Sequence, residues 1–426
     1  MSSRIDVAVA VVGAGPVGAT LACALAEAGI ATAVIDQAPL PPMEEPAFDG
    51  RAYAIARGSR AVLERAGIWA RLGEHPCPIL GIRVSDGVPG RPASPFTLDF
   101  DPDEADGEPQ EASQGSQPSQ GSQPSQGSQP SNAFGWMVEA RHLRIALNAQ
   151  LPRITHLECF APARITEVAR GKDAARITLD DGTVITTKLV VGAEGRNSPL
   201  REDAGIRTTR FAYRQSALVC AVAHQRPHGN VAVEHFLPAG PFAILPLNDS
   251  DGEHRSAIVW TDRPESIARL HALADQELSR EVARRFGAHL GAVAVRGLRW
   301  TYPLGVLHAH RYTDTRLALA GDAAHGIHPI AGQGLNLGFR DAGALAQLVI
   351  AAELDRRDPG GPETLGAYER ARRGPNLAML FATDALDRLF STNLFPVRLA
   401  RGLGIAAVDR MPRLKRLFMR AAMGLG

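Results

Sequence analysis

"IDVAVAVVGAGPVGATLACALAEAGIATAVID", residues 5–36, holds the pattern from which the fold class is predicted. Its first part, up to Val12, is an apolar run typical of a strand that is buried on both faces. A glycine-rich turn then leads into an alanine-rich stretch, which favours a helix, and a second apolar run ends in Asp36. The order strand, turn, helix, strand predicts an α/β protein with a Rossmann-like domain.

The glycines of this turn predict the kind of ligand. Gly13, Gly15 and Gly18 match the GxGxxG spacing, in which the bare backbone can approach a pyrophosphate and the helix N-terminus attracts its charge. Asp36 follows after about 20 residues, where an acid accepts hydrogen bonds from ribose hydroxyls. The segment therefore predicts a dinucleotide site, without deciding between FAD and NAD.

A second bare stretch, "GDAAHGIHPIAGQGLN" (321–336), follows another predicted buried strand and opens another predicted helix. Strand, acid, loop and helix N-terminus form a second ligand cradle. A nucleotide held at both ends must be long, which favours FAD. Asp322 can accept from its ribityl hydroxyls, and the helix N-terminus at residues 332–336 can stabilise negative charge on the flavin ring.

Composition and pattern divide the rest of the chain. Hydrophobic residues make up 45% and charged residues 21%, with a net charge of +1, which fits a soluble globular protein and gives no overall attraction to nucleic acid. The predicted parts are an FAD-binding domain at 1–100, 133–209 and 304–361; a disordered insert at 101–132, with three tandem copies of SQGSQP; a β-rich substrate domain at 210–303, with one helix near 264–288; and a C-terminal helical region with a basic tail at 362–426.

The cysteines predict neither a metal site nor a disulfide framework. They are scattered, with no CxxC pair or histidine-rich cluster beside them, which fits a reducing, cytoplasmic setting. The four are Cys23, Cys77, Cys159 and Cys220.

Three spaced motifs carry a resemblance to a known family. "GAGPVG" (13–18), "GAEGRNSPLR" (192–201) and the 321–336 stretch resemble the single-component FAD-dependent aromatic hydroxylases, the para-hydroxybenzoate hydroxylase-like superfamily. Further strings resemble its UbiH-type ubiquinone-biosynthesis hydroxylases. These strings are "FDGRAYAI" (48–55), "AGPFAILPL" (239–247), "TYPL" (301–304) and "HPIAGQGLNLGFRD" (328–341).

The resemblance implies which residues bind the cofactor. Glu194 departs from the usual aspartate of the middle motif by one methylene but keeps the charge, which puts its particular hydrogen bonds in doubt. By itself, Arg51 favours a solvated surface position, and Arg141 would equally suit an exposed helix position; the resemblance favours contact with FAD for both. The implied set is Gly13, Gly15, Gly18 and Asp36 for the ADP half, Arg51, Arg141 and Glu194, Asp322 for the ribityl chain, and Pro329, Gly332, Gly334 and Asn336 for the flavin ring.

Catalytic candidates are fewer, since the resemblance assigns the oxidation to the flavin. His325 and His328 lie beside the ring segment, where either a proton-handling or a structural hydrogen-bonding role is open. Tyr213, in the β-rich domain, is a candidate for the substrate wall, with core packing as the alternative.

The implied reaction is hydroxylation of the aromatic ring of a polyprenyl phenol in ubiquinone biosynthesis. The resemblance implies bound FAD, with O2 as oxidant and NAD(P)H as a transient co-substrate, because the chain shows no second Rossmann signature. Two alternatives stay open: a flavoprotein monooxygenase acting on another small phenol, and a non-catalytic FAD-binding assembly protein.

The C-terminal tail predicts where the protein works. Residues 393–426 hold seven cations and one anion, a net of +6. "RLKRLFMRAAM" (413–423) sets Leu414, Leu417 and Phe418 on one helical face beside a basic face, as in interfacial helices. A cytoplasmic protein is expected, whose tail contacts the inner face of the membrane or a ubiquinone-biosynthesis complex. A basic helix packed on the FAD domain is the alternative.

Overall fold

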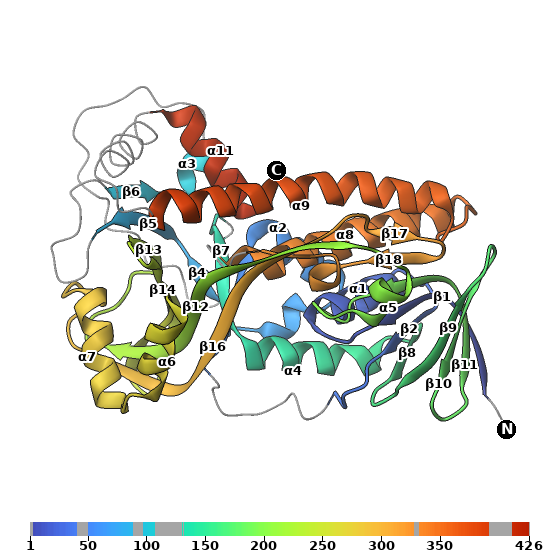
Figure 1. The fold of residues 1–426 in the computed structure, drawn as a ribbon, viewed down its shortest axis with the longest axis horizontal. Coiled ribbons are helices and arrows are strands. Elements are labelled where there is room, and N and C mark those ends of the chain that lie inside the picture. Colours follow the sequence, from blue (N-terminus) through green and yellow to red (C-terminus); the bar gives the residue numbers. More distant parts are fainter. Residues whose placement is uncertain are drawn as a thin grey trace.

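Two large sheets form the ends of an elongated molecule, and long helices connect them (Figure 1). The computed structural model describes residues 3–40, 50–87, 97–106, 130, 132–327, 332–391 and 411–425. Most of the predicted insert at 101–132 lies outside the described residues. Among the described helices, none is both long and apolar enough to cross a membrane.

The first sheet is the core of the predicted FAD-binding domain. Its strand order is β17-β18-β11-β1-β2-β8, with β10 beside β11 and β9 beside β10. β1 lies between β2 and β11 and is parallel to both, which buries its apolar side chains as the sequence predicted. The strands are β1 (Arg4–Val12), β2 (Thr32–Ile35), β8 (Leu157–Phe160), β9 (Ile165–Arg170), β10 (Ala175–Leu179), β11 (Val184–Gly192), β17 (Thr313–Asp314) and β18 (Leu317–Leu319).

Helices and one small sheet pack around this first sheet. α1 packs against α8, α2 and α4, and its glycine-rich start follows β1 directly. The small sheet has the order β3-β7-β4 and lies between the two ends of the molecule. The elements are α1 (Pro16–Glu27), α2 (Arg57–Arg65), α4 (Ala140–Gln150), α5 (Pro199–Asp203), α8 (Gln333–Leu354) and α9 (Pro362–Ser391); the short helices η2 (Trp69–Leu72), η3 (Leu151–Arg153) and η4 (Gly321–Ala323); and β3 (Ala52–Ala56), β4 (Cys77–Ile79) and β7 (Gly135–Glu139).

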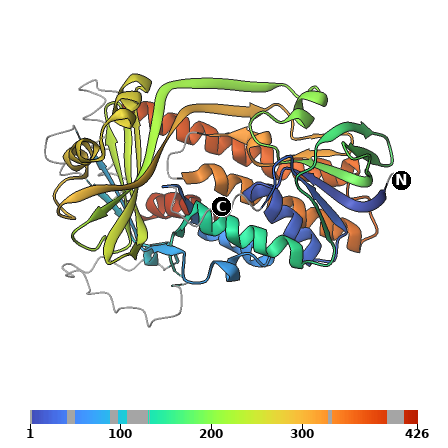
Figure 2. The ribbon, with the colours of Figure 1, turned by 90° about the horizontal axis from the view of Figure 1, so that it is seen from below.

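The second sheet is the predicted β-rich domain, in the order β19-β16-β12-β15-β14-β13-β5-β6. Its two longest strands, β12 and β16, have 17 residues each and run side by side back to the FAD-binding domain (Figure 2). The strands are β5 (Gly81–Asp86), β6 (Thr97–Phe100), β12 (Thr208–His224), β13 (Val231–Leu237), β14 (Gly240–Ser250), β15 (Glu253–Asp262), β16 (Val293–Ala309) and β19 (His325–Gly326).

Two sequence predictions for this domain were wrong. β5 pairs in parallel with β13, so residues 81–86 and 97–100 belong to the second sheet and not to the FAD-binding domain. The single helix expected near 264–288 is two helices, α6 (Pro264–Ala272) and α7 (Asp275–Phe286). Both helices contact β16, and they cover one face of the sheet with the apolar cluster around Trp260.

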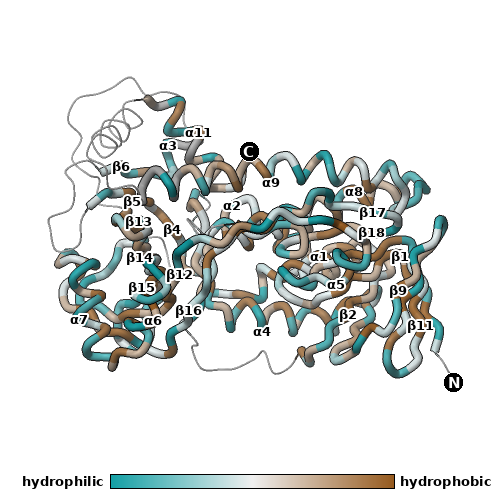
Figure 3. Tube along the Cα trace, in the orientation of Figure 1, coloured by the Kyte–Doolittle hydropathy of each residue, from teal (hydrophilic) through white to brown (hydrophobic). Residues whose placement is uncertain are grey.

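The described residues of the C-terminal region form two helices, α9 and α11. α9 runs along the molecule beside α8, and α11 (Pro412–Met423) lies beside the short α3 (Asp103–Asp106). The hydropathy-coloured tube shows apolar residues gathered in the central strands and α8, with hydrophilic residues on the outer turns (Figure 3). The FAD-binding domain therefore rests on one continuous apolar core, which holds the ends of its parallel strands in place.

Candidate active site

The first cradle is a tight turn that only glycine can form. Gly13 has φ of 101°, and a Cβ there would lie 2.5 Å from the Ala193 carbonyl oxygen. A Cβ at Gly18 would lie 1.9 Å from the Gly13 oxygen, because α1 begins directly against the turn. Gly15 differs: nothing lies within 4 Å of its Cβ position, so the backbone there borders open space at the helix N-terminus.

Asp36 closes this cradle from the end of β2. Its carboxylate accepts hydrogen bonds from the Ala14 amide at 2.7 Å and the Ala38 amide at 2.8 Å. The acid is half-buried, and these two bonds fix it beside the glycine turn. Two of the features needed for a ribose and a pyrophosphate therefore lie next to each other, as the motif predicted.

The second cradle is the start of α8. Gly332 caps the helix in the left-handed conformation, φ 62°, and a Cβ there would lie 3.0 Å from the Ala54 Cβ. Gly334 again has no atom within 4 Å of its Cβ position. Asn336 is fully buried; it accepts from the Ala56 amide at 2.8 Å and donates to the Ala54 oxygen at 2.7 Å. Asn336 therefore clamps the helix start to β3 and shapes the cradle from behind.

Asp322 lies on the turn η4 with an exposed carboxylate. It is 3.3 Å from the Arg196 guanidinium, on the opposite motif "GAEGRNSPLR". Arg201 of that motif is buried and donates to the Ala323 oxygen at 2.9 Å and the Arg196 oxygen at 2.8 Å. The second and third motifs are thus tied together, which holds Asp322 in place between the two cradles.

A buried polar cluster anchors the same turn from below. Asp341 of α8 accepts from the Gly321 amide at 3.1 Å, from Arg372 at 2.8 Å, from Asn376 at 3.0 Å, and from His325 Nε2 at 2.5 Å. Burial alone would raise the pKa of Asp341, but His325 and Arg372 outweigh it and lower the pKa to about 2. The structure therefore gives His325, 1% exposed, a buried hydrogen bond to Asp341.

Three further implied cofactor residues also contact other parts of the protein. Glu194 accepts from the Ser198 hydroxyl at 2.8 Å and the Leu200 amide at 3.2 Å, so its carboxylate caps α5, and burial raises its pKa. Arg51 lies over the Trp300 ring, 4.7 Å from its centroid. Arg141 pairs with Glu139 at 2.7 Å and lines a cleft between α4 and the β14–β15 turn. Their roles toward FAD stay predictions.

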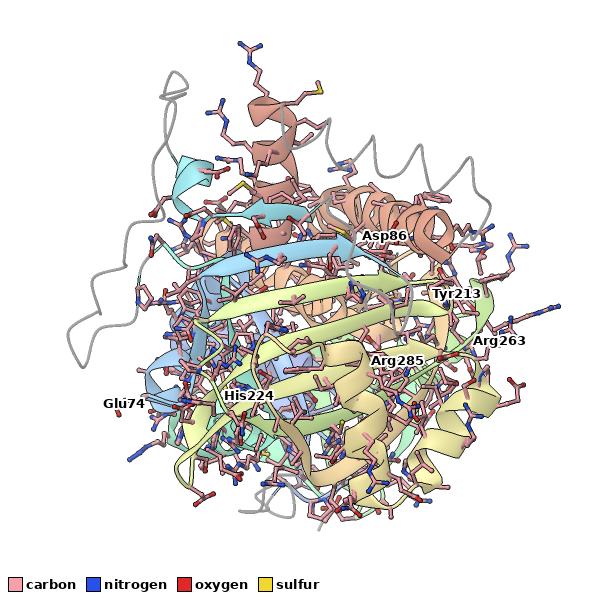
Figure 4. The ribbon with its side chains drawn as sticks, turned by 90° about the vertical axis from the view of Figure 1, so that its left-hand side faces the viewer. Glu74, Asp86, Tyr213, His224, Arg263 and Arg285 are labelled. Atoms are coloured by element: carbon pink, nitrogen blue, oxygen red, sulfur yellow. The ribbon has the colours of Figure 1, made fainter. Side chains whose placement is uncertain are left out.

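Tyr213 lies on β12, an interior strand of the second sheet, at the end of the sheet nearest α9 (Figure 4). Its hydroxyl donates to Asp384 of α9 at 2.7 Å, and its ring packs against an apolar cluster that surrounds the end of β19 and the first turns of α8. A place in the substrate wall is therefore consistent with its position. The apolar cluster beside Tyr213 contains Val306, Ile327, Leu337 and Leu380. His328 and Pro329 lie outside the described residues.

The two cradles fit a long dinucleotide such as FAD. Each is a helix N-terminus whose half-buried glycine, Gly15 or Gly334, borders open space, so backbone amides and positive helix ends would face both halves of such a ligand. Asp36 and Asp322 supply oxygen acceptors near each end, for ribose and ribityl hydroxyls. In the part of the chain that the structure describes, no cluster of histidine, cysteine or acidic side chains suits a metal.

Comparison with known proteins decides the family. The model of the FAD binding domain family matches residues 6–380. The chain belongs to this FAD-binding family. Ubiquinone hydroxylase UbiL of Rhodospirillum rubrum is 46% identical over 416 residues, which cover 98% of this chain and 89% of that protein.

A second relative agrees with this family, and a solved structure shares the fold. 3-Demethoxyubiquinol 3-hydroxylase of Escherichia coli is 33% identical over 419 residues, which cover 98% of each chain. The crystal structure of p-nitrophenol 4-monooxygenase PnpA from Pseudomonas putida, at 17% identity, superposes with a TM-score of 0.74 over 99% of this chain and 98% of that one. The predicted fold class, the cofactor FAD and the enzyme class, an FAD-dependent monooxygenase, are confirmed.

Two functional positions escaped the sequence prediction. Asp341 and Arg201 both lie inside quoted motifs, yet neither was assigned a role. An acid within the apolar pattern of α8 is a signal for Asp341, because a buried carboxylate must find donors. Its partners Arg372 and Asn376 lie on another helix, and no local pattern indicates them.

Proposed function

We propose that this protein is an FAD-dependent monooxygenase that hydroxylates the aromatic ring of a polyprenyl phenol in ubiquinone biosynthesis, with NAD(P)H and O2 as co-substrates. The observation that carries the proposal is the two-ended cradle, in a chain that aligns over nearly its whole length with a ubiquinone hydroxylase. When bound, FAD supplies the redox chemistry that passes electrons from NAD(P)H to O2 and one oxygen atom to the ring.

The protein's own residues bind FAD, orient the substrate and shield the flavin ring from water. Amides at the start of α1, together with Asp36, hold the ADP half, and the start of α8 faces the ring half. The apolar cluster at Val306, Ile327 and Leu337 excludes water beside the ring half and suits a substrate that carries a prenyl chain. Tyr213, held by Asp384, presents a polar atom within this apolar wall, where it can orient a phenol.

The test is a hydroxylation assay with the FAD-loaded protein. We expect a short-tailed prenyl phenol to gain one oxygen atom, with NAD(P)H consumed and the added atom labelled when isotopically labelled O2 is supplied. NAD(P)H oxidation that yields only hydrogen peroxide with every prenyl phenol, but product with a small unprenylated phenol, would favour the alternative substrate class. A protein that binds FAD yet oxidises no NAD(P)H would favour the assembly-protein alternative.

We also propose that the outer face of α11 contacts an anionic membrane surface, where a prenylated substrate resides. Leu417 is 62% exposed, Met411 is 53% exposed, and Arg413 and Arg420 are exposed beside them. Arg413, Leu417 and Arg420 share one side of the helix, while Met419 and Met423 face the protein. Met411 lies just before its first turn. An apolar residue flanked by cations is the composition of interfacial helices.

The matched variants are Leu417→Asp on this face and Leu354→Asp at the exposed end of α8. Leu354 is 79% exposed, so both substitutions place one charge on an exposed leucine. Loss of one inserted leucine is worth about 1.5–3 kcal/mol, so Leu417→Asp is expected to weaken co-sedimentation with phosphatidylglycerol vesicles ~10-fold or more. Equal binding of both variants would move the membrane contact to another surface.

A further inference from the structure

The C-terminal helix α11 is built into the protein by its inner face. Met419 and Met423 are 1% and 0% exposed, within the apolar cluster formed by the small sheet and β14–β15. Lys415, 8% exposed, pairs with Glu104 at 2.8 Å. These contacts favour the packed-helix alternative for the inner face, and removal of the tail would uncover the apolar surface that these two methionines cover.

The end of α11 reaches the start of α8. The last carbonyls of a helix have no partner within it, and side chains often satisfy them. The Gln333 amide donates to the Ala422 oxygen, in the last turn of α11, at 3.3 Å. Gln333 is the first residue of α8, directly after the left-handed Gly332, and is 6% exposed.

Two further contacts make this a three-way junction. Arg340 donates to the other side of the Gln333 amide, Oε1, at 2.9 Å, and its guanidinium lies 3.4 Å from a Cβ built on Gly424. A Cβ at Gly58, in the first turn of α2, would lie 2.4 Å from the Gly424 oxygen. Ala56, the residue directly before α2, donates its amide to Asn336 of α8, so the end of α11 contacts both elements that this bond joins.

We propose that Gln333 is a positioning residue for the flavin ring: it joins the start of α8 to the docked end of α11, so that α11 sets the geometry of the ring cradle. The inference rests on the placement of the FAD ring at residues 332–336. Gln333 points away from that cradle, into the junction, so it acts through the backbone of Gly332 and Gly334. The ADP cradle at Gly15 shares none of these contacts.

The test compares FAD with ADP on the full-length apoprotein. Gln333→Leu keeps the bulk but removes the bonds to Ala422 and Arg340, and Gly58→Ala displaces the end of α11 without touching Gln333. Gln276→Leu, on the exposed surface of α7, is the matched control. Loss of one or two hydrogen bonds predicts FAD bound ~5- to 10-fold more weakly in both junction variants, with ADP affinity unchanged.

The visible absorption spectrum of the bound flavin supplies a second readout. We expect it to shift in Gln333→Leu and Gly58→Ala, because the ring environment changes, and to stay unchanged in Gln276→Leu. Equal weakening of FAD and ADP would mean general destabilisation and would overturn the positioning role, as would no change in either. If wild-type apoprotein bound ADP but not FAD, the proposed placement of the ring itself would fail, which is a different result.

Discussion

Gly15→Val is expected to abolish FAD retention while the protein stays folded. Gly15 has φ −64° and ψ 175°, a conformation open to any residue, and no atom lies within 4 Å of its Cβ position. The valine methyl groups therefore enter only the space that the pyrophosphate needs. Loss of about two charge-assisted amide bonds, at ~1.5 kcal/mol each, predicts at least ~100-fold weaker FAD binding. The measurements are flavin content after gel filtration and the melting temperature of the apoprotein.

Gly374→Val is the matched control. Gly374 on α9 also has open space around its Cβ position, but it lies outside both cradles, so this variant is expected to keep its FAD. Gly18→Val serves as the opposite case: its Cβ would collide with the Gly13 oxygen, and the apoprotein itself is expected to lose stability. Full flavin content in Gly15→Val would mean that the pyrophosphate does not bind at this turn.

Local patterns predicted the parts of the fold whose signals are local. The glycine spacing of residues 13–18, the apolar strand before it and the acid after it all lie within one continuous segment, and the structure has each in place. β5 was misassigned because its partner, β13, lies far along the chain, and strand pairing leaves no mark in either sequence. The break between α6 and α7 was missed because Leu273 and Ala274 include no glycine or proline.

For the site, too, the local features could be predicted from the sequence and the long-range contacts could not. Motif spacing placed Asp36, Asp322 and Gly334 where a cofactor could meet them, but it could not tell which motif residues face the ligand. Asn336 and Glu194 form their hydrogen bonds with the backbones of β3 and α5 instead. Such support depends on contacts between distant segments, which a single sequence does not encode in any local period.

Asp341→Asn is expected to cause a large loss of stability. The carboxylate accepts four donors, two on each oxygen, and all of its side-chain partners are buried. In asparagine, an NH2 group replaces one of the two acceptor oxygens. This NH2 group would face the two donors that the replaced oxygen accepted from, and Arg372 would lose its counter-charge. Breaking a buried ion pair from one side costs about 3–5 kcal/mol, measurable as a lower urea midpoint of the apoprotein.

The double variant Asp341→Asn, Arg372→Met separates charge from packing. If the loss comes mainly from the uncompensated guanidinium, removing Arg372 should restore part of the lost stability, although each single change is destabilising. Additive losses would instead mean that packing around α9 dominates.

The dependence of stability on acid pH gives an independent check. The pKa of Asp341 is lowered to about 2, so its contribution to the free energy of unfolding is complete above about pH 4 and is lost as the pH falls toward 2. Asp341→Asn should remove that part of the acid dependence, and because Asp341 holds the Gly321 amide, the variant should also bind FAD more weakly than wild type at neutral pH.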